Sequence, residues 1–167
     1  TAVAQAGIPV VPGSDGPIVD DEAAAVLAEE IGYPVLVKAA GGGGGIGMAL
    51  VKKPSKLARA LESCRDRGQS SFGNPEIYLE KYIVNPRHIE VQVLFDAHGH
   101  GVHLFERECS LQRRHQKVIE EAPSPFVSTQ PGMRAAICEA AVQVSKAIGY
   151  RNAGTVEFVV SPDGEFY

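Results

Sequence analysis

Apolar residues recur along this chain at two spacings, one typical of helices and the other typical of strands. Recurrence every three or four residues predicts helices over 21–31, over about a dozen residues from 54 onward, and over 129–149. Alternation and short apolar runs predict strands at 35–37, 48–51, 76–83, 88–95, 102–108, 154–160 and 165–167. The two element types follow no regular strand–helix–strand rhythm, which indicates the α+β class.

Capping and breaking residues mark where these elements begin and end. Asp20 or Asp21 is placed to cap the first full helix, and Gly32 ends it. Pro54 opens the second helix, and the Ser-, Gly- and Asn-rich segment 68–75 is expected to be a loop. Segment 110–122 is expected to be strand plus loop. The residues expected to face the core from the helices at 54 and 129 are Leu57, Ala60, Leu61, Cys64, Ile137, Ala140, Ala141, Val144 and Ile148.

A break at Asn85-Pro86 divides the chain by element type, because the part that follows is richer in strands. At 167 residues the chain is long enough for one substantial core or two small lobes. We expect two, a first domain over 1–83 and a second over 84–167.

Five consecutive glycines at 41–45 stand between the two apolar runs 35–37 and 48–51, shortly after Lys38. Glycine-rich backbone can approach a ligand closely and direct several N–H groups at one anion, and the lysine adds a positive charge. A flexible linker is the alternative, but the run lacks serine and a linker seldom joins paired strands. It is not a Walker A loop, since no Gly-Lys-Ser/Thr follows. We therefore expect a hairpin whose loop is a flap over phosphates.

Composition narrows the classes of partner and compartment. A net charge of −4 provides no general basic field, so nucleic acid is not expected as a partner. No apolar run approaches the roughly 18 residues that span a bilayer, and the first residues lack a signal-peptide pattern. Three widely spaced cysteines favour reduced thiols over a disulfide framework or zinc site. We expect no membrane association and a cytoplasmic location.

A second chemical signal lies in the charged segment 106–121. It carries four basic side chains within five residues, flanked by glutamates: Arg113, Arg114, His115 and Lys117. A solvated charge run is one interpretation. The other is a site for a small polar ligand or anion, because Gln112 and His115 add hydrogen-bond donors next to Lys117. Alternation along a strand would place Arg113, His115 and Lys117 on one face and Gln112 and Arg114 on the other.

Glu157 interrupts the apolar run 154–160, and a carboxylate in a buried strand is costly unless it is paired or binds a metal. Mg²⁺ with nucleotide phosphates typically takes one or two carboxylates. An outward-facing glutamate on a half-exposed strand is the alternative.

Two further candidates stand outside these segments. His88 begins a strand, and a single histidine in a protein is more often structural than functional. Residues 80–83 could form a hinge whose backbone contacts an adenine edge.

Several runs together resemble the ATP-grasp superfamily, and specifically the biotin carboxylase component of biotin-dependent acyl-CoA or pyruvate carboxylases. The matching runs cover essentially the whole chain: 11–17, 33–45, 80–83, 85–93, 106–117 and 154–157. The glycine hairpin also suits carbamoyl-phosphate synthetase and other ATP-grasp ligases. The Gln-Arg-Arg-His-Gln-Lys run at 112–117 is more specific to biotin carboxylases.

The resemblance implies a fold and a set of roles. Residues 1–83 would be the glycine-rich lid subdomain and residues 84–167 part of the central antiparallel-sheet subdomain, truncated at its C-terminus. Lys38 would contact phosphate, with Gly44 and Gly45 in the flap. Lys117 would help hold bicarbonate, and Glu157 would be a Mg²⁺ ligand. The residues implied to hold adenine or line the nucleotide pocket are Glu80, Lys81, Tyr82, Ile83, His88, Gln112 and His115.

The implied activity is ATP- and Mg²⁺-dependent carboxylation of biotin by bicarbonate through carboxyphosphate, with Mn²⁺ as a possible metal. The implied partners are a biotinylated carrier domain and a carboxyltransferase in the parent enzyme; in a eukaryote the location would be the mitochondrial matrix. In the family a second metal-binding Glu and the base toward bicarbonate lie beyond the position of Tyr167, so the fragment alone is expected to be inactive. Ile46 also stands where many members carry Arg or Lys. The alternatives are a nucleotide-binding module without catalysis and another ATP-grasp carboxylate or amine ligase, such as a carbamoyl-phosphate synthetase-like enzyme.

Overall fold

The chain forms two compact units in a computed structural model that describes residues 2–43, 46–114 and 116–167. One unit is Val11–Ile83, and the other is Val84–Tyr167 joined by the segment that ends at Val10. The short helix α1 (Ala2–Gln5) and the residues after it pack in the second unit, where Ile8 is buried in its core. Sequence analysis placed this segment with the first domain. Its packing partners lie more than 70 residues away, so the local sequence pattern does not indicate them. The identity of the units as lid and central subdomain stays a prediction.

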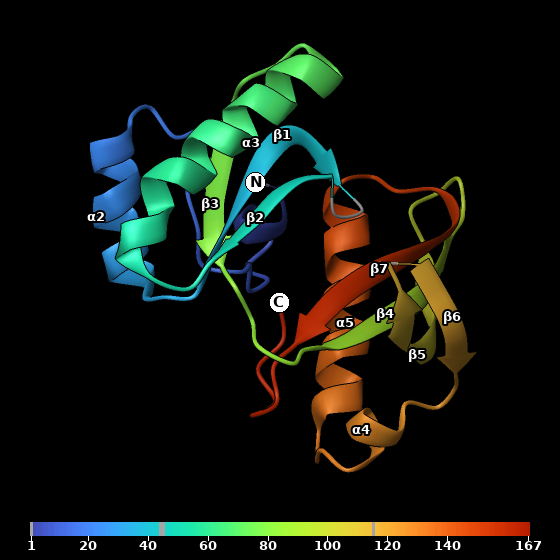
Figure 1. Cartoon of the computed structure of the whole chain (residues 1–167). Coiled ribbons are helices and arrows are strands. Elements are labelled where there is room, and N and C mark those ends of the chain that lie inside the picture. Colours follow the sequence, from blue (N-terminus) through green and yellow to red (C-terminus); the bar gives the residue numbers. More distant parts are fainter. Residues whose placement is uncertain (1, 44–45, 115) are drawn as a thin grey trace. The chain divides into compact units, whose positions relative to one another are not determined.

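The unit Val11–Ile83 contains an antiparallel sheet of order β2-β1-β3, formed by β1 (Val35–Gly43), β2 (Ile46–Val51) and β3 (Ile77–Lys81). Strand β1 extends into the glycine run as far as Gly43, and it pairs with β2 (Figure 1) in the register Lys38↔Met48. This confirms the strand–loop–strand prediction for the described residues. Gly44 and Gly45 lie outside the described residues.

Two helices cover one face of this sheet. Helix α2 (Asp21–Ile31) begins at Asp20, whose side chain accepts a hydrogen bond from the Ala23 amide at 2.7 Å, and Gly32 is its C-cap. The one-turn helix η1 (Pro54–Lys56) leads into α3 (Leu57–Phe72). The predicted inward residues of α3 are confirmed, because three are buried and Ala60 packs against them. The core of this unit consists of Ala24, Ala28, Val35, Val37, Val51, Leu57, Leu61, Cys64, Ile77 and Leu79.

Helix α3 is longer than the sequence predicted, because Gly68 lies inside it and does not begin a loop. Gly68 is buried, and a Cβ atom there would lie 2.5 Å from the Asn74 carbonyl oxygen and 3.2 Å from the Ala39 side chain. The glycine therefore allows the helix to pass close to neighbouring backbone. The composition of 68–75 is typical of a loop, but the glycine at 68 is explained by how closely the Asn74 carbonyl and the Ala39 side chain approach it.

We predict that Gly68→Ala lowers the free energy of unfolding by about 1–3 kcal/mol, the usual range for overpacking a closely packed site. The clash is with a backbone oxygen, so it outweighs the roughly 1 kcal/mol by which alanine favours a helix over glycine. Urea unfolding followed by circular dichroism measures this. Gly16→Ala is the matched control, because a Cβ there meets nothing within 4 Å. Equal stability of the two variants would contradict the prediction.

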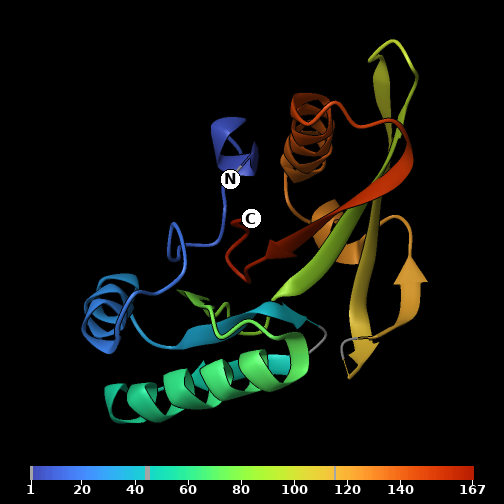
Figure 2. The same cartoon turned by 90° about the horizontal axis from the view of Figure 1, so that it is seen from above.

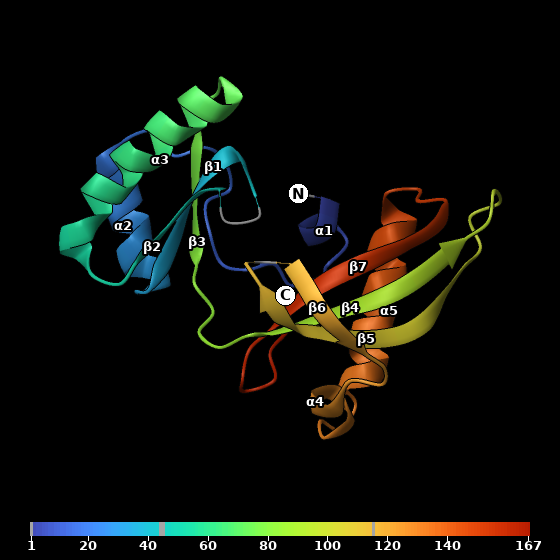
Figure 3. The same cartoon turned by 45° about the vertical axis from the view of Figure 1, so that its right-hand side comes forward.

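The other unit is built on an antiparallel sheet of order β6-β5-β4-β7. Its strands are β4 (Arg87–Phe95), β5 (Gly101–Arg113), β6 (Gln116–Glu121) and β7 (Asn152–Val160). Strands β4 and β5 form a long twisted pair, visible in green and yellow in Figure 2. Helix α5 (Met133–Ala147) runs across one face of the sheet, preceded by the short helix α4 (Pro125–Ser128) (Figure 3). The core residues on this face include Ile89, Val91, Val93, Phe95, Ile137, Cys138, Ala141, Phe158 and Val160.

Three details of this unit differ from the sequence analysis, and one is that the predicted strand 165–167 is only an isolated bridge between Val160 and Phe166. Strand β5 continues to Arg113 and β6 returns from Gln116, so residues 112–117 do not form one continuous strand. The predicted separation of Gln112 from Lys117 onto opposite faces is therefore wrong, since the two are cross-strand partners. The predicted helix 129–149 starts at Met133, and Ile148 is its C-cap with 56% of its surface exposed.

In the described part of the chain, no helix is both long enough and apolar enough to cross a bilayer. Cys64, Cys109 and Cys138 are free thiols, and all three are buried.

Candidate functional site

The unit Val11–Ile83 places Lys38 and Glu80 on the polar face of its sheet. Strand pairing sets Lys38 opposite Tyr78 and Leu36 opposite Glu80, while the intervening residues are buried against the helices. The Lys38 Nζ atom lies 3.0 and 3.1 Å from the two Glu80 carboxylate oxygens. The lysine charge is thus available at the surface but balanced by Glu80, which an incoming phosphate would have to replace as its partner.

A hollow of about 340 Å³ lies over this pair. Its lining includes Lys38, Glu80, Ser14 and Gly42, so it combines a cation, a hydroxyl group and glycine backbone. These are the groups that phosphate-binding loops use. The structure therefore brings Lys38 and the described end of the glycine run, both predicted for phosphate, together with Glu80, which was predicted for adenine.

The predicted adenine hinge, residues 80–83, already uses two of its backbone donors within the unit. The Lys81 amide donates to the Pro12 carbonyl at 2.7 Å, and the Tyr82 amide donates to the Pro34 carbonyl at 3.1 Å. The Lys81 side chain also donates to the Gly32 carbonyl at 2.8 Å. Lys81 therefore has a structural role here, and adenine binding by this segment, Ile83 included, stays a prediction.

The unit Val84–Tyr167 gathers a second set of polar residues on the sheet face away from α5. Alternation along β4 buries Ile89 and Val91 against the helix, so His88 and Glu90 point to the opposite face. Glu90 is directly opposite Arg107 on β5 and directly opposite Glu157 on β7. Two carboxylates thus face each other across neighbouring strands.

Lys117 reaches this pair of carboxylates from β6. Its Nζ atom donates to Glu90 Oε2 and, at 2.6 Å, to Glu157 Oε1. Arg107 donates to the other Glu90 oxygen, with its Nε atom at 2.8 Å. Glu90 has 1% of its side chain exposed, whereas Glu157 has 55% exposed. The buried carboxylate is therefore fully paired and the outer one stays accessible.

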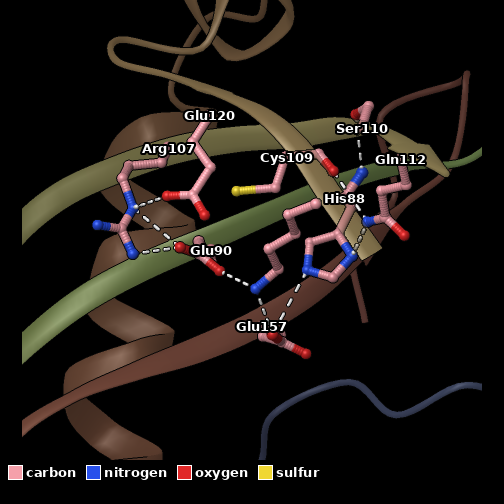
Figure 4. A network of polar contacts seen from close by, with 9 residues as sticks. His88, Glu90, Arg107, Cys109, Ser110, Gln112, Glu120 and Glu157 are labelled. Atoms are coloured by element: carbon pink, nitrogen blue, oxygen red, sulfur yellow. Dashed lines mark hydrogen bonds and ion pairs between the residues drawn. The ribbon is translucent and has the colours of Figure 1, made fainter. Parts of the chain in front are cut away.

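His88 and Gln112 lie beside this group (Figure 4). The Gln112 Nε2 atom is 2.8 Å from the Cys109 carbonyl and 3.0 Å from His88 Nδ1. Because the carbonyl only accepts, this amide nitrogen is the donor to His88 Nδ1, and a neutral ring carries its proton on Nε2. That Nε2 atom is buried without a hydrogen-bond partner in the described structure, 3.7 Å from Glu157 Oε1. His115, the other predicted member, lies outside the described residues.

Burial and ion pairing set the charge states of this group. Burial alone would raise the pKa of Glu90, but hydrogen bonds from Lys117 and Arg107 outweigh it and the pKa is lowered. Burial alone would lower the pKa of Lys117, but its hydrogen bonds to Glu157 and Glu90 raise it. Burial, followed by the nearby charges of Glu90 and Glu120, raises the pKa of the Cys109 thiol to about 11. At neutral pH Glu90 and Lys117 are therefore charged and the Cys109 thiol is protonated.

Sequence reasoning missed Glu90 and Arg107. A signal for Glu90 was present, because alternation from His88 to Phe95 places Glu90 on the same face as His88. No comparable signal marked Arg107, since its role depends on strand pairing between β4 and β5. The structure does bring together four of the predicted residues: Lys117, Gln112, His88 and Glu157.

Two further glutamates of the charged segment point to the helix side of the sheet. Glu106 and Glu108 lie opposite Val91 and Ile89, and both are buried. Glu106 is held by Arg134 of α5, with nitrogen–oxygen distances of 2.9 to 3.1 Å. Glu108 accepts from Ser124 at 2.7 Å and from Arg87 at 3.1 Å. These contacts tie the sheet to α4 and α5 and are structural.

Comparison with known proteins gives a consistent result over the whole chain. Residues 1–167 match the family described as the ATP binding domain of the carbamoyl-phosphate synthase L chain. The chain is 55% identical over 166 residues to Biotin carboxylase 2 of Bacillus subtilis, covering 99% of this chain and 37% of that protein. It is 53% identical to a pyruvate carboxylase of Staphylococcus aureus, covering 100% of this chain and 14% of that protein.

Solved structures agree with these relatives. A complex of Campylobacter jejuni biotin carboxylase with β,γ-ATP matches with a TM-score of 0.91 at 49% identity, covering 99% of this chain and 37% of that one. The biotin carboxylase domain of Hydrogenobacter thermophilus 2-oxoglutarate carboxylase, in complex with MgADP, ADP and bicarbonate, matches with a TM-score of 0.90 at 46% identity, covering 99% of this chain and 36% of that one. The chain thus spans 14% to 37% of the length of these proteins.

Proposed function

Because the chain belongs to the family of the carbamoyl-phosphate synthase L chain ATP-binding domain, and its relatives are biotin carboxylases with the ATP-grasp fold, we propose that it is a segment of an ATP- and Mg²⁺-dependent biotin carboxylase. The observation that carries this proposal is the cluster of Lys117, Glu157, His88 and Gln112 on one sheet face, in a chain matched over its whole length by biotin carboxylases.

The proposed reaction is attack of bicarbonate on the γ-phosphate of ATP, followed by transfer of CO₂ from carboxyphosphate to biotin. Negative charge develops on phosphoryl oxygens in such a transfer, so fixed positive charge and exclusion of water lower the barrier. We assign Lys38 and the glycine flap, Gly44 and Gly45 included, to the phosphates. We assign Lys117 to bicarbonate, because its ammonium group is oriented by a buried carboxylate and remains partly exposed. Adenine would be held by residues 80–83, with His88, Gln112 and His115 lining the nucleotide pocket.

The described residues fit a divalent metal at Glu157. Its carboxylate is more than half exposed, and one oxygen of Glu90 lies within 4.8 Å of one of its oxygens. Carboxylate oxygens are the protein ligands that Mg²⁺ prefers. When bound, Mg²⁺, or Mn²⁺ in its place, would neutralise phosphate charge. The proposed roles of the chain's own residues are to hold the anions and to keep them aligned.

The partners and compartment follow as further proposals. A biotinylated carrier domain would bring biotin to the site, and a carboxyltransferase of the parent enzyme would consume the carboxylated product. Relatives named pyruvate carboxylase support such a parent. Cytoplasm stays our prediction for the location. The relatives are bacterial, archaeal and chloroplastic, and the mitochondrial matrix stays the prediction for a eukaryotic enzyme that is not chloroplastic.

A chimera tests the function. Residues 1–167 replace the matching segment of B. subtilis Biotin carboxylase 2, and the unmodified protein is the control. We expect bicarbonate-dependent ATP cleavage and carboxybiotin formation by the chimera, and none by residues 1–167 alone. A folded chimera that binds ATP without cleaving it would favour a nucleotide-binding module. Cleavage that depends on an amine and not on biotin would favour another ATP-grasp ligase, such as a carbamoyl-phosphate synthetase-like enzyme. Turnover by residues 1–167 alone would contradict the proposed inactivity.

A further inference from the structure

Glu90 and Glu157 form a cross-strand pair of like charges, which is unfavourable unless a cation lies between them. They are register partners on β4 and β7, and side chains so placed have Cβ atoms about 4.5–5.5 Å apart. Arg107 neutralises one oxygen of Glu90 from the side of β5. The remaining Glu90 oxygen and the Glu157 carboxylate therefore require a further positive charge.

Lys117 supplies that charge, and its ammonium group occupies the same carboxylate oxygens that a metal would need. Its Nζ atom contacts Glu90 Oε2 and lies 2.6 Å from Glu157 Oε1. A divalent cation bound to Glu157 at ordinary carboxylate–metal distances would lie next to this ammonium group. The metal and the ammonium group would repel each other strongly, because burial of the neighbouring Glu90 shows that water screens little of this charge.

We propose that Lys117 is an internal competitor for the divalent metal at Glu157, and that metal binding releases the Lys117 ammonium group from Glu157. The proposal rests on the metal role of Glu157 given under Proposed function. On release, Lys117 keeps Glu90 as its anchor, because Glu90 is buried and its side chain is also held by Arg107. The freed side of the ammonium group then faces an incoming anion instead of Glu157.

His88 does not take the place of Lys117 in this exchange. Its Nδ1 atom accepts a hydrogen bond from Gln112, so the neutral ring presents an N–H group at Nε2 toward Glu157. A protonated nitrogen cannot bind a metal. The exchange at Glu157 is therefore between the metal and the Lys117 ammonium group.

The competition predicts that removing the lysine charge tightens metal binding. The experiment uses residues 1–167 without nucleotide, with Mn²⁺ as the probe and free Mn²⁺ measured by electron paramagnetic resonance. We expect Lys117→Met to lower the Mn²⁺ dissociation constant about tenfold, within the usual range for coupling between two binding events. Lys117→Arg keeps a cation between the carboxylates and should stay near the wild type. Lys146→Met is the matched control, because Lys146 lies exposed in the last turn of α5 and forms no ion pair with the described residues.

A second readout follows the lysine directly. In the wild type, diamagnetic Mg²⁺ should shift the side-chain resonance of Lys117 Cε in carbon-13 spectra, and Glu157→Gln should abolish the shift. Circular dichroism establishes that each variant is folded. If Lys117→Met is not folded, Lys117→Gln replaces it in the Mn²⁺ titration.

The outcomes separate this inference from the proposed function. If Glu157→Gln leaves Mn²⁺ binding unchanged, the metal role of Glu157 fails, and the competition fails with it. If Glu157→Gln weakens Mn²⁺ binding but the uncharged Lys117 variant binds no more tightly than the wild type, only the competition is overturned. Tighter binding by the uncharged variant, with the arginine and Lys146 variants unchanged, supports it.

Discussion

Lys117→Met in the chimera should reduce bicarbonate-dependent carboxylation of biotin by about 100-fold or more, the usual loss when a charge-stabilising group is removed from an active site. The reason is that Lys117 carries the positive charge that we assign to bicarbonate, and Glu90 fixes its position. Steady-state kinetics with bicarbonate as the varied substrate measure the effect. The MgATP Michaelis constant should change far less, since we assign the phosphates to Lys38 and the glycine flap.

Two variants make this result specific. Lys117→Arg retains the charge but not the compact ammonium geometry, so it should recover only part of the activity. Lys146→Met should leave turnover unchanged. If Lys117→Met keeps bicarbonate-dependent turnover near that of the chimera, Lys117 is not the bicarbonate residue and another ATP-grasp ligase becomes the better interpretation.

Arg134→Met should lower the melting temperature of the unit Val84–Tyr167 by about 10 °C or more, because each kcal/mol corresponds to about 4–8 °C in a unit of this size. The variant removes the guanidinium group that holds Glu106, whose side chain is 0% exposed. A buried carboxylate without its partner is strongly unfavourable. Differential scanning calorimetry measures the change, and Arg151→Met is the control, because Arg151 is exposed and forms no ion pair with the described residues. Equal melting temperatures for the two variants would contradict the prediction.

The same pair predicts a pH dependence. Burial alone would raise the pKa of Glu106, but the hydrogen bonds from Arg134 outweigh it, so the folded pKa lies below the unfolded value of about 4.3. This contribution to stability is present above the unfolded pKa and is lost as the pH falls through the folded pKa. In Arg134→Met the hydrogen bonds from Arg134 are lost, so burial raises the pKa of Glu106. Acidification should therefore reduce the difference in stability between the variant and the wild type. A gap that widens on acidification would contradict this assignment.

Local features of the fold were readable from the sequence because they depend on residues a few positions apart. Asp20 caps α2 through the amide of Ala23, and two apolar runs around the glycines pair as a hairpin. Where the prediction failed, the local pattern did not show the contacts that matter. Gly68 lies inside α3 and packs close to the Ala39 side chain of β1, and the segment ending at Val10 packs in the unit of α5.

The candidate site divides in the same way. The sequence by itself determined which residue types are present: a lysine before a glycine run, Gln112 and Lys117 in one charged segment, and a lone carboxylate in an apolar strand. Only the tertiary structure decided that Lys117 bridges Glu90 and Glu157, which lie 27 and 40 residues from it along the chain. The physical reason is strand register: the pairing of β4 with β7 sets the two carboxylates opposite each other, and the return of β6 along β5 brings the ammonium group to them.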